Sequence, residues 1–137
     1  MLRKKDVEFF AHQSGVSLEI AERDVVLTHA LQLMSEEGRL EHFAFKGGTC
    51  IRKIHLGATG RFSMDLDFTA SRSMDRDEVV LELEATFNQT HHDIAYTLDL
   101  GDDTWRITQG GVSLTVQPTY SHEWNSEGGF DVQVSFR

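Results

Sequence analysis

The sequence predicts an α+β protein in which helices pack on one side of a mixed or antiparallel sheet. Two features of the apolar pattern lead to this prediction. Apolar residues recur with a helical period in two segments before residue 90, and after them the period changes to the two-residue alternation of strands. The chain has no internal repeat, no low-complexity tract and a single proline, so we expect one domain over residues 1–137.

The composition excludes several classes of protein. Of the 137 residues, 39% are hydrophobic and 26% are charged, which is ordinary for a soluble globular domain. The single cysteine, Cys50, excludes an internal disulfide framework. No apolar run approaches the ~18 residues of a membrane span and the start lacks a secretory signal, so a cytoplasmic protein is expected. The net charge of −9 disfavours simple coating of nucleic acid, although the segment from Lys46 to Arg61 carries four basic residues and no acidic one.

Both predicted helices have recognisable starts. The first is expected over residues 18–37, with Ser17 as its N-cap and a glycine just after its last turn. The second is expected over residues 76–89, where Asp75 and Glu78 have the spacing of a capping box.

Strands are predicted between and after these helices. The apolar run 43–45 stops at a Gly-Gly turn, a short helix is expected over 49–56, and residues 64–68 alternate as a strand does. Later segments alternate in the same way, and glycines between the first three favour an antiparallel meander with one covered face. These later segments are 92–98, 105–107, 112–116 and 130–136, with a polar loop over 121–129 before the last.

Asp65 and Asp67 have the clearest chemical meaning. They lie two residues apart on a predicted strand, so both carboxylates point to one face while Met64, Leu66 and Phe68 point to the core. Neighbouring carboxylates repel each other unless a cation lies between them. Mg²⁺ is bound in this way, through carboxylates, water and substrate phosphates.

A glycine pair upstream adds a second feature. Gly47 and Gly48 allow the backbone to approach a ligand closely, and a helix starting at Thr49 would direct its free N–H groups toward a phosphate. The combination predicts a site for a metal-bound triphosphate. Taken singly, the aspartates could form a solvated strand face and the glycines a plain turn.

The order of these residues resembles a known signature. Gly-Gly, a gap and Ser-x-Asp-x-Asp is similar to the pattern of the DNA polymerase β-like nucleotidyltransferase superfamily. The longer sequence pattern, over residues 45–49 and 60–68, resembles the AbiEii/AbiGii toxin family within that superfamily. The stretch 21–27 is similar to that family's N-terminal helix. The resemblance covers residues 17–70 well and continues weakly to Phe136, and it implies a nucleotidyltransferase-like fold.

The resemblance also implies a role for each matching position. Asp65 and Asp67 would be catalytic and hold Mg²⁺, with Mn²⁺ as the alternative ion. A nucleoside triphosphate would donate a nucleotidyl group to an acceptor hydroxyl, with tRNA as the expected acceptor and pyrophosphate as the leaving group. Family members act in toxin–antitoxin and phage-defence systems, so a cognate antitoxin is an expected partner. The nucleotide-binding positions would be Lys46, Gly47, Gly48, Thr49, Arg61 and Ser63, of which Lys46 and Arg61 are assigned from charge alone.

Two departures from the family pattern support an alternative. Relatives carry a third carboxylate on a later strand, and here that position is Gln133, which cannot act as a base at neutral pH. Asp131 lies on the same strand face two residues earlier and is the candidate replacement. Relatives also continue further, so this domain is expected to lack their C-terminal part. The alternative is a catalytically degenerate or truncated relative that binds a nucleotide or a protein.

A histidine pair is the remaining candidate for a metal site. His91 and His92 are adjacent, and adjacent residues on a strand point to opposite faces. We therefore do not expect them to chelate a metal together.

Overall fold

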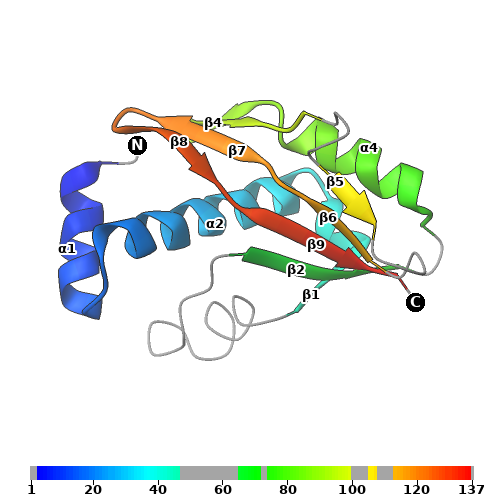
Figure 1. Ribbon diagram of the computed structural model, residues 1–137, viewed down its shortest axis with the longest axis horizontal. Helices are drawn as coiled ribbons and strands as arrows, with labels where there is room; N and C mark the ends of the chain where they lie inside the picture. The colour runs from blue at the N-terminus through cyan, green and yellow to red at the C-terminus, as the bar shows by residue number, and fades with distance from the viewer. Residues whose placement is uncertain (1–2, 47–64, 72–73, 100–104, 108–112, 137) are drawn as a thin grey trace.

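Three α-helices and two β-sheets make up the described part of the chain (Figure 1). The computed structural model describes residues 3–46, 65–71, 74–99, 105–107 and 113–136. The predicted α+β class is confirmed. Among the described helices, none combines the length and apolar character that crossing a membrane requires. The helices are α1 (Lys4–Ser14), α2 (Leu18–Glu36) and α4 (Arg76–Thr86), with a short 3₁₀ helix η1 (Arg39–Glu41) after α2.

Helix α2 agrees closely with the helix predicted over residues 18–37. The Ser17 side chain accepts a hydrogen bond from the Ile20 N–H at 3.2 Å, which satisfies one of the free donors of the first turn. Gly38 follows the helix with φ 75°, a left-handed conformation that glycine adopts without steric cost. The apolar residues of α2 belong to the main core of the protein; those that are buried are Ala21, Val26, Leu27, Ala30, Leu33 and Met34.

Helix α4 begins where predicted and ends earlier. The Asp75 carboxylate accepts a hydrogen bond from the Glu78 N–H at 2.9 Å, as the capping-box spacing indicates. The helix stops at Thr86 and not at Gln89, because two side chains that follow it donate to its last carbonyl oxygens. The Asn88 amide donates to the Glu84 carbonyl at 2.8 Å, and the Gln89 amide donates to the Thr86 carbonyl at 3.0 Å.

Helix α1 was not predicted. It ends at Ser14 and is followed by Gly15, which has φ 70°, and the Val16 N–H donates to the Ala11 carbonyl at 3.1 Å. Only Val7 and Ala11 of this helix are buried, so its apolar stripe is too narrow to be recognised from periodicity.

The strands form one five-stranded and one four-stranded sheet. The larger sheet is mixed, because β2 and β9 run parallel while the other neighbouring strands run antiparallel. Its strands, in spatial order, are β1 (Phe43–Lys46), β2 (Asp65–Ala70), β9 (Asp131–Ser135), β6 (Ser113–Val116) and β5 (Trp105–Ile107). The smaller sheet is antiparallel and consists of β3 (Thr90–His91), β4 (Ile94–Thr97), β7 (Thr119–His122) and β8 (Asn125–Gly129).

A long two-stranded ribbon joins the two sheets. β6 leads into β7 and β8 leads into β9, so the same antiparallel pair contributes to both sheets (Figure 1). The pairing continues across the junction, where the Phe130 N–H donates to the Pro118 carbonyl at 3.1 Å. The predicted antiparallel meander is confirmed for the pair β5 and β6, and it is wrong for β4, which pairs with β7 and not with β5. The predicted loop over 121–129 is also wrong, because most of it forms the β7–β8 hairpin.

The β3–β4 hairpin corrects one premise of the expectation for the histidine pair, namely that both residues lie on a strand. Its strands close on the pair His91 and Ile94, and the two residues between them have φ values of 50° at His92 and 66° at Asp93. Two left-handed residues in a two-residue loop are the mark of a tight hairpin turn. Because strand geometry ends at His91, the side chain of His92 turns back toward it, and the two ring centroids lie 4.2 Å apart.

Candidate active site

Asp65, Asp67 and Asp131 lie on one face of the larger sheet. In β2 and β9 the alternate residues Leu66, Phe68, Val132 and Val134 are buried in the core, so the residues between them face the other way. The parallel register pairs Asp65 with Asp131 and Asp67 with Gln133. Neighbouring strands lie about 4.8 Å apart, so this register places the Asp131 backbone directly beside that of Asp65.

Asp65 lies in an environment that disfavours its negative charge. Burial and then the nearby charge of Asp131 raise the pKa of the Asp65 carboxyl, with a smaller contribution from Asp67. A hydrogen bond from the Asp131 backbone and the positive charge of Arg23 act in the opposite direction without cancelling the rise in pKa. The fold therefore holds two carboxylates together at a cost that a cation between them would remove.

Asp67 has an oxygen that the described residues leave unsatisfied. Its Oδ1 atom is buried and has no hydrogen-bond partner in the described part of the chain. In the sheet register Asp67 lies between Lys46 of β1 and Gln133 of β9. Buried polar atoms without partners are rare, and a bound ion or water is a common explanation. Carboxylate oxygens are the hard donors that Mg²⁺ prefers, so the chemistry of Asp67 and its neighbouring aspartates suits that ion.

A residue in the connection between β6 and β7 orients the side chain of Asp131. The Gln117 side chain, just after β6, donates to Asp131 Oδ1 at 3.1 Å. The other oxygen of the carboxylate is not involved in this bond. Sequence reasoning did not single out Gln117, because only the observed pairing of β6 with β9 brings it beside Asp131.

Arg23 brings a positive charge to this site from α2. Its guanidinium is half-buried, lies 4.0 Å from the Glu19 carboxylate and acts electrostatically on Asp65. The stretch 21–27 was noted only for its family resemblance, and no role was assigned to Arg23. A cation at this place balances part of the charge of the aspartates and is available to a phosphate-bearing ligand.

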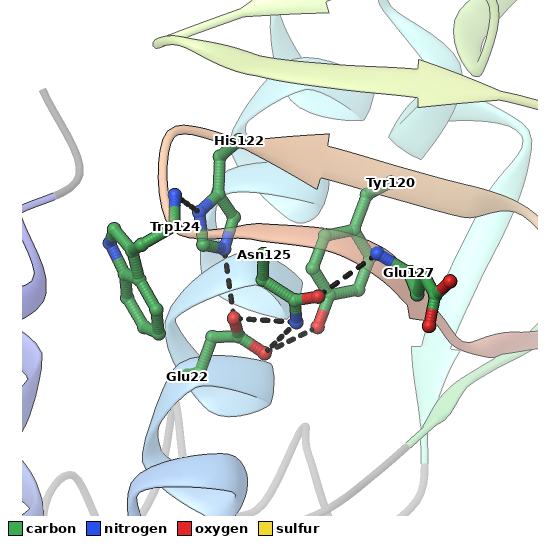
Figure 2. Close-up of polar contacts among 6 residues, drawn as sticks. All are labelled: Glu22, Tyr120, His122, Trp124, Asn125 and Glu127. Carbon is green, nitrogen blue, oxygen red and sulfur yellow. Dashed lines mark hydrogen bonds and ion pairs between the residues drawn. The ribbon is translucent and has the colours of Figure 1, made fainter.

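Beside Arg23, the buried Glu22 ties α2 to the β7–β8 hairpin (Figure 2). Its carboxylate accepts hydrogen bonds from the Tyr120 hydroxyl at 2.9 Å and from the Asn125 amide at 3.0 and 2.8 Å. His122 Nε2 lies 2.9 Å from Glu22 Oε2, the oxygen that also accepts the shorter of the two Asn125 bonds. Because His122 Nδ1 accepts from the Trp124 N–H at 3.4 Å, the proton of a neutral ring is on Nε2, which donates to Glu22.

The network around Glu22 has a structural role. Burial, followed by the hydrogen bond to Glu22, raises the pKa of Tyr120, so its hydroxyl remains a donor. The Asn125 orientation is set by a further bond, since its Oδ1 accepts from the Glu127 N–H at 2.9 Å (Figure 2). The network holds the start of α2 against the same ribbon that carries Asp131, and thereby positions Arg23 beside Asp65.

Several predicted site residues cannot be placed. The side chain of Lys46 is outside the described part of the chain, although its backbone is the register partner of Asp67. The predicted helix over 49–56 also lies outside the described residues, and so do the remaining nucleotide-binding positions: Gly47, Gly48, Thr49, Arg61 and Ser63.

Most of the chain matches the model of a known protein family. A family model described as nucleotidyl transferase AbiEii toxin of a type IV toxin–antitoxin system matches residues 29–137. No curated protein matches the chain. The matched segment includes Asp65, Asp67 and Asp131 and leaves Glu22 and Arg23 outside it.

Proposed function

The chain belongs to the AbiEii family of nucleotidyl transferase toxins from type IV toxin–antitoxin systems, and on this premise we propose that it is an Mg²⁺-dependent nucleotidyltransferase. It takes a nucleoside triphosphate and transfers the nucleotidyl group to the hydroxyl of an acceptor, which we propose to be tRNA. The observation that carries the proposal is the placement of Asp65, Asp67 and Asp131 on one sheet face.

Asp65 and Asp67 are the residues that would hold the ion, with Mn²⁺ as the alternative to Mg²⁺. The raised pKa of Asp65 and the unsatisfied Oδ1 of Asp67 both support this assignment. When bound, the ion supplies positive charge for the attacking and leaving oxygens of the transfer reaction. Arg23 adds a further positive charge near Asp65.

Asp131 is proposed as the group that accepts the proton of the acceptor hydroxyl. As the hydroxyl oxygen bonds to the α-phosphorus, the bond from that phosphorus to the leaving pyrophosphate breaks, and the proton passes to the carboxylate. Gln117 occupies one oxygen of Asp131 and so directs the other. In this proposal Asp131 takes the place of the acid that relatives carry at the position of Gln133.

The phosphates are proposed to bind at the positions where the chain resembles the family. These are Lys46, Gly47, Gly48, Thr49, Arg61 and Ser63. The register of Lys46 opposite Asp67 is consistent with a phosphate lying beside the metal ligands. The family implies an antitoxin as the counterpart of the toxin, and we propose that the system acts in phage defence.

A second candidate follows from Gln133. The residue beside Asp67 is a glutamine, which offers no carboxylate to a metal ion and no base to the acceptor hydroxyl. In the second candidate function the chain is therefore a degenerate relative that binds a nucleotide or a protein without nucleotidyl transfer. The two candidates differ in whether a covalent product forms.

Transfer of label distinguishes them. The chain is incubated with each α-labelled nucleoside triphosphate, Mg²⁺ and total tRNA, beside Asp65→Asn and Asp67→Asn variants. Asp77→Asn, at an exposed position on α4, is the matched control. We expect labelled RNA with the wild type and the control, and a loss of about 10²–10³-fold in each site variant, as for other groups that stabilise developing charge. Mg²⁺-dependent triphosphate binding without transfer would support the second candidate, and no triphosphate binding at all would overturn the first candidate and restrict the second to binding a protein.

A further inference from the structure

A second cluster of metal-ligating side chains lies at the other end of α2. Glu36 is the last residue of that helix, and His91 and His92 lie on the β3–β4 hairpin. Each of the three offers a ligand atom, and these atoms all lie within 4.8 Å of one another. Glu36 comes thirteen residues after Arg23, which is about 20 Å along a helix at 1.5 Å per residue. The cluster is therefore separate from the aspartate site.

The backbone of the hairpin makes this convergence possible. His92 and Asp93 are the only residues other than glycine with positive φ in the described part of the chain. A two-residue hairpin turn requires left-handed backbone at both of its central residues. Here the turn directs the His92 ring to the side of His91, where Glu36 Oε2 already lies 2.6 Å from His91 Nε2.

Ring nitrogens in the cluster lack partners. His91 Nδ1 is buried without a hydrogen-bond partner among the described residues, and the same holds for Nδ1 of His29. The His29 ring, on α2 about two turns before Glu36, lies 5.2 Å from that of His92, measured between centroids. Buried nitrogens without partners are uncommon, and an ion or water in contact with them is a usual reason.

We propose that Glu36, His91 and His92 bind a zinc ion that joins the end of α2 to the β3–β4 hairpin. Imidazole nitrogen and one carboxylate form a donor set that suits zinc, whereas magnesium prefers oxygen ligands alone. Two histidines and a glutamate complete three of the four positions of a tetrahedral zinc site and leave one for water or for a further ligand.

The ion adds a connection that the fold otherwise makes with few contacts. β3 has only two residues, and the described contacts between this hairpin and the end of α2 include the His91–Glu36 pair and a bond from the Gln89 amide to the Glu37 carboxylate at 3.0 Å. A ligand that binds only the folded state stabilises it in proportion to its affinity and concentration. Zinc is therefore expected to raise the melting temperature of the protein.

Zinc titration of the full chain tests the proposal. Metal-free protein is titrated with zinc chloride in excess Mg²⁺, with calorimetry for the stoichiometry and thermal unfolding for the change in Tm. Cobalt is used as a second probe, because its absorption spectrum reports tetrahedral coordination by nitrogen. We expect one zinc ion per chain, no displacement by Mg²⁺ and an increase in Tm.

Two variants and one control locate the ion. His92→Asn keeps a residue that tolerates left-handed backbone, and Glu36→Gln keeps the size of the side chain. Each should weaken zinc binding more than about 100-fold, since the loss of outer partners alone costs about 10–100-fold. His12→Asn changes an exposed histidine of α1 and should leave the affinity unchanged. Absence of 1:1 binding, or wild-type affinity in His92→Asn, would overturn the proposal and leave only a His91–Glu36 ion pair.

Discussion

Glu22 and Asp67 are two acidic residues of one protein with opposite surroundings. Tyr120, His122 and Asn125 surround the Glu22 carboxylate and occupy both of its oxygens. Asp67 has a buried Oδ1 with no hydrogen-bond partner among the described residues. In the first case the protein itself supplies the donors that a buried carboxylate needs. In the second case it leaves an acceptor open.

The difference separates a structural acid from a candidate ligand-binding acid. A buried carboxylate with a full set of donors is stable as it is and favours one arrangement of its neighbours. Carboxylates that lie together, as Asp65 and Asp131 do, repel each other and are stabilised by a cation. Substitutions should therefore affect stability at Glu22 and activity at the aspartates.

The largest expected effect is the loss of stability in Glu22→Ala. Removing the carboxylate leaves the Tyr120 hydroxyl, the Asn125 amide and His122 buried without their acceptor. Each buried donor left without its acceptor costs about 1–3 kcal/mol, so the loss of this carboxylate should lower the free energy of unfolding by about 3–5 kcal/mol. Urea unfolding measures this change.

The control for Glu22→Ala lies three residues earlier on the same helix. The Glu19 side chain is 79% exposed and its ion pair with Arg23 spans 4.0 Å, so Glu19→Ala should change stability by less than about 0.5 kcal/mol. Equal stability of the two variants would show that the Glu22 network is not structural.

Asp131→Asn should have the next largest effect, on activity. A group that accepts a proton in the transition state contributes about 10²–10⁴-fold, so we expect nucleotidyl transfer to fall by about 10²-fold or more at unchanged Tm. Single-turnover transfer of an α-labelled triphosphate over a range of pH measures it. Adding Gln133→Asp to this variant places an acid beside Asp67 and should restore part of the rate. If Asp131→Asn retains the full rate, the proposed proton acceptor is wrong.

The parts of the fold that were predicted have signals within a few residues of the chain. α2 and α4 were found from apolar periodicity and from the side-chain caps at Ser17 and Asp75. The β7–β8 hairpin was missed because its interior is polar: the side chains that it turns toward α2 include His122 and Asn125, and apolar alternation cannot reveal a core built around a carboxylate.

The candidate site was predictable in the same limited sense. The spacing of Asp65 and Asp67 was enough to place both on one face, and the burial of Leu66 and Phe68 confirms that face. The neighbour of each aspartate depends on the parallel register of β2 and β9, which are distant in the chain. The pairing of Asp65 with Asp131 and the approach of Arg23 therefore required the tertiary structure.

Gly128→Ala tests the packing around Tyr120, which donates to Glu22. A Cβ atom at Gly128 would overlap the ring of Tyr120, whereas one at Gly129 would only reach ordinary contact with the Pro118 carbonyl at 3.4 Å. Overpacking of this kind costs about 1–3 kcal/mol, so Gly128→Ala should lower the free energy of unfolding by that amount and Gly129→Ala should not. A lower Tm for Gly129→Ala than for Gly128→Ala would contradict this packing.

The smallest expected effect is a gain of stability in Asp65→Asn without metal. Because the pKa of Asp65 is raised in the folded state, the folded protein holds this proton more tightly than the unfolded chain does. Its stability therefore falls as pH rises from the ordinary aspartate value of 3.8 through the raised one, and Asp65→Asn removes that cost. We expect the variant to be more stable at neutral pH, by up to about 0.5 kcal/mol as for other exposed substitutions, and the gain to vanish below the ordinary value.

The control, Asp77→Asn, should lower the stability instead, since Asp77 lies in the first turn of α4, where negative charge is favourable. Urea unfolding in chelator at several pH values decides the matter: a destabilised Asp65→Asn would mean that the fold satisfies this carboxylate as it satisfies Glu22, and the contrast between the two regions would fail.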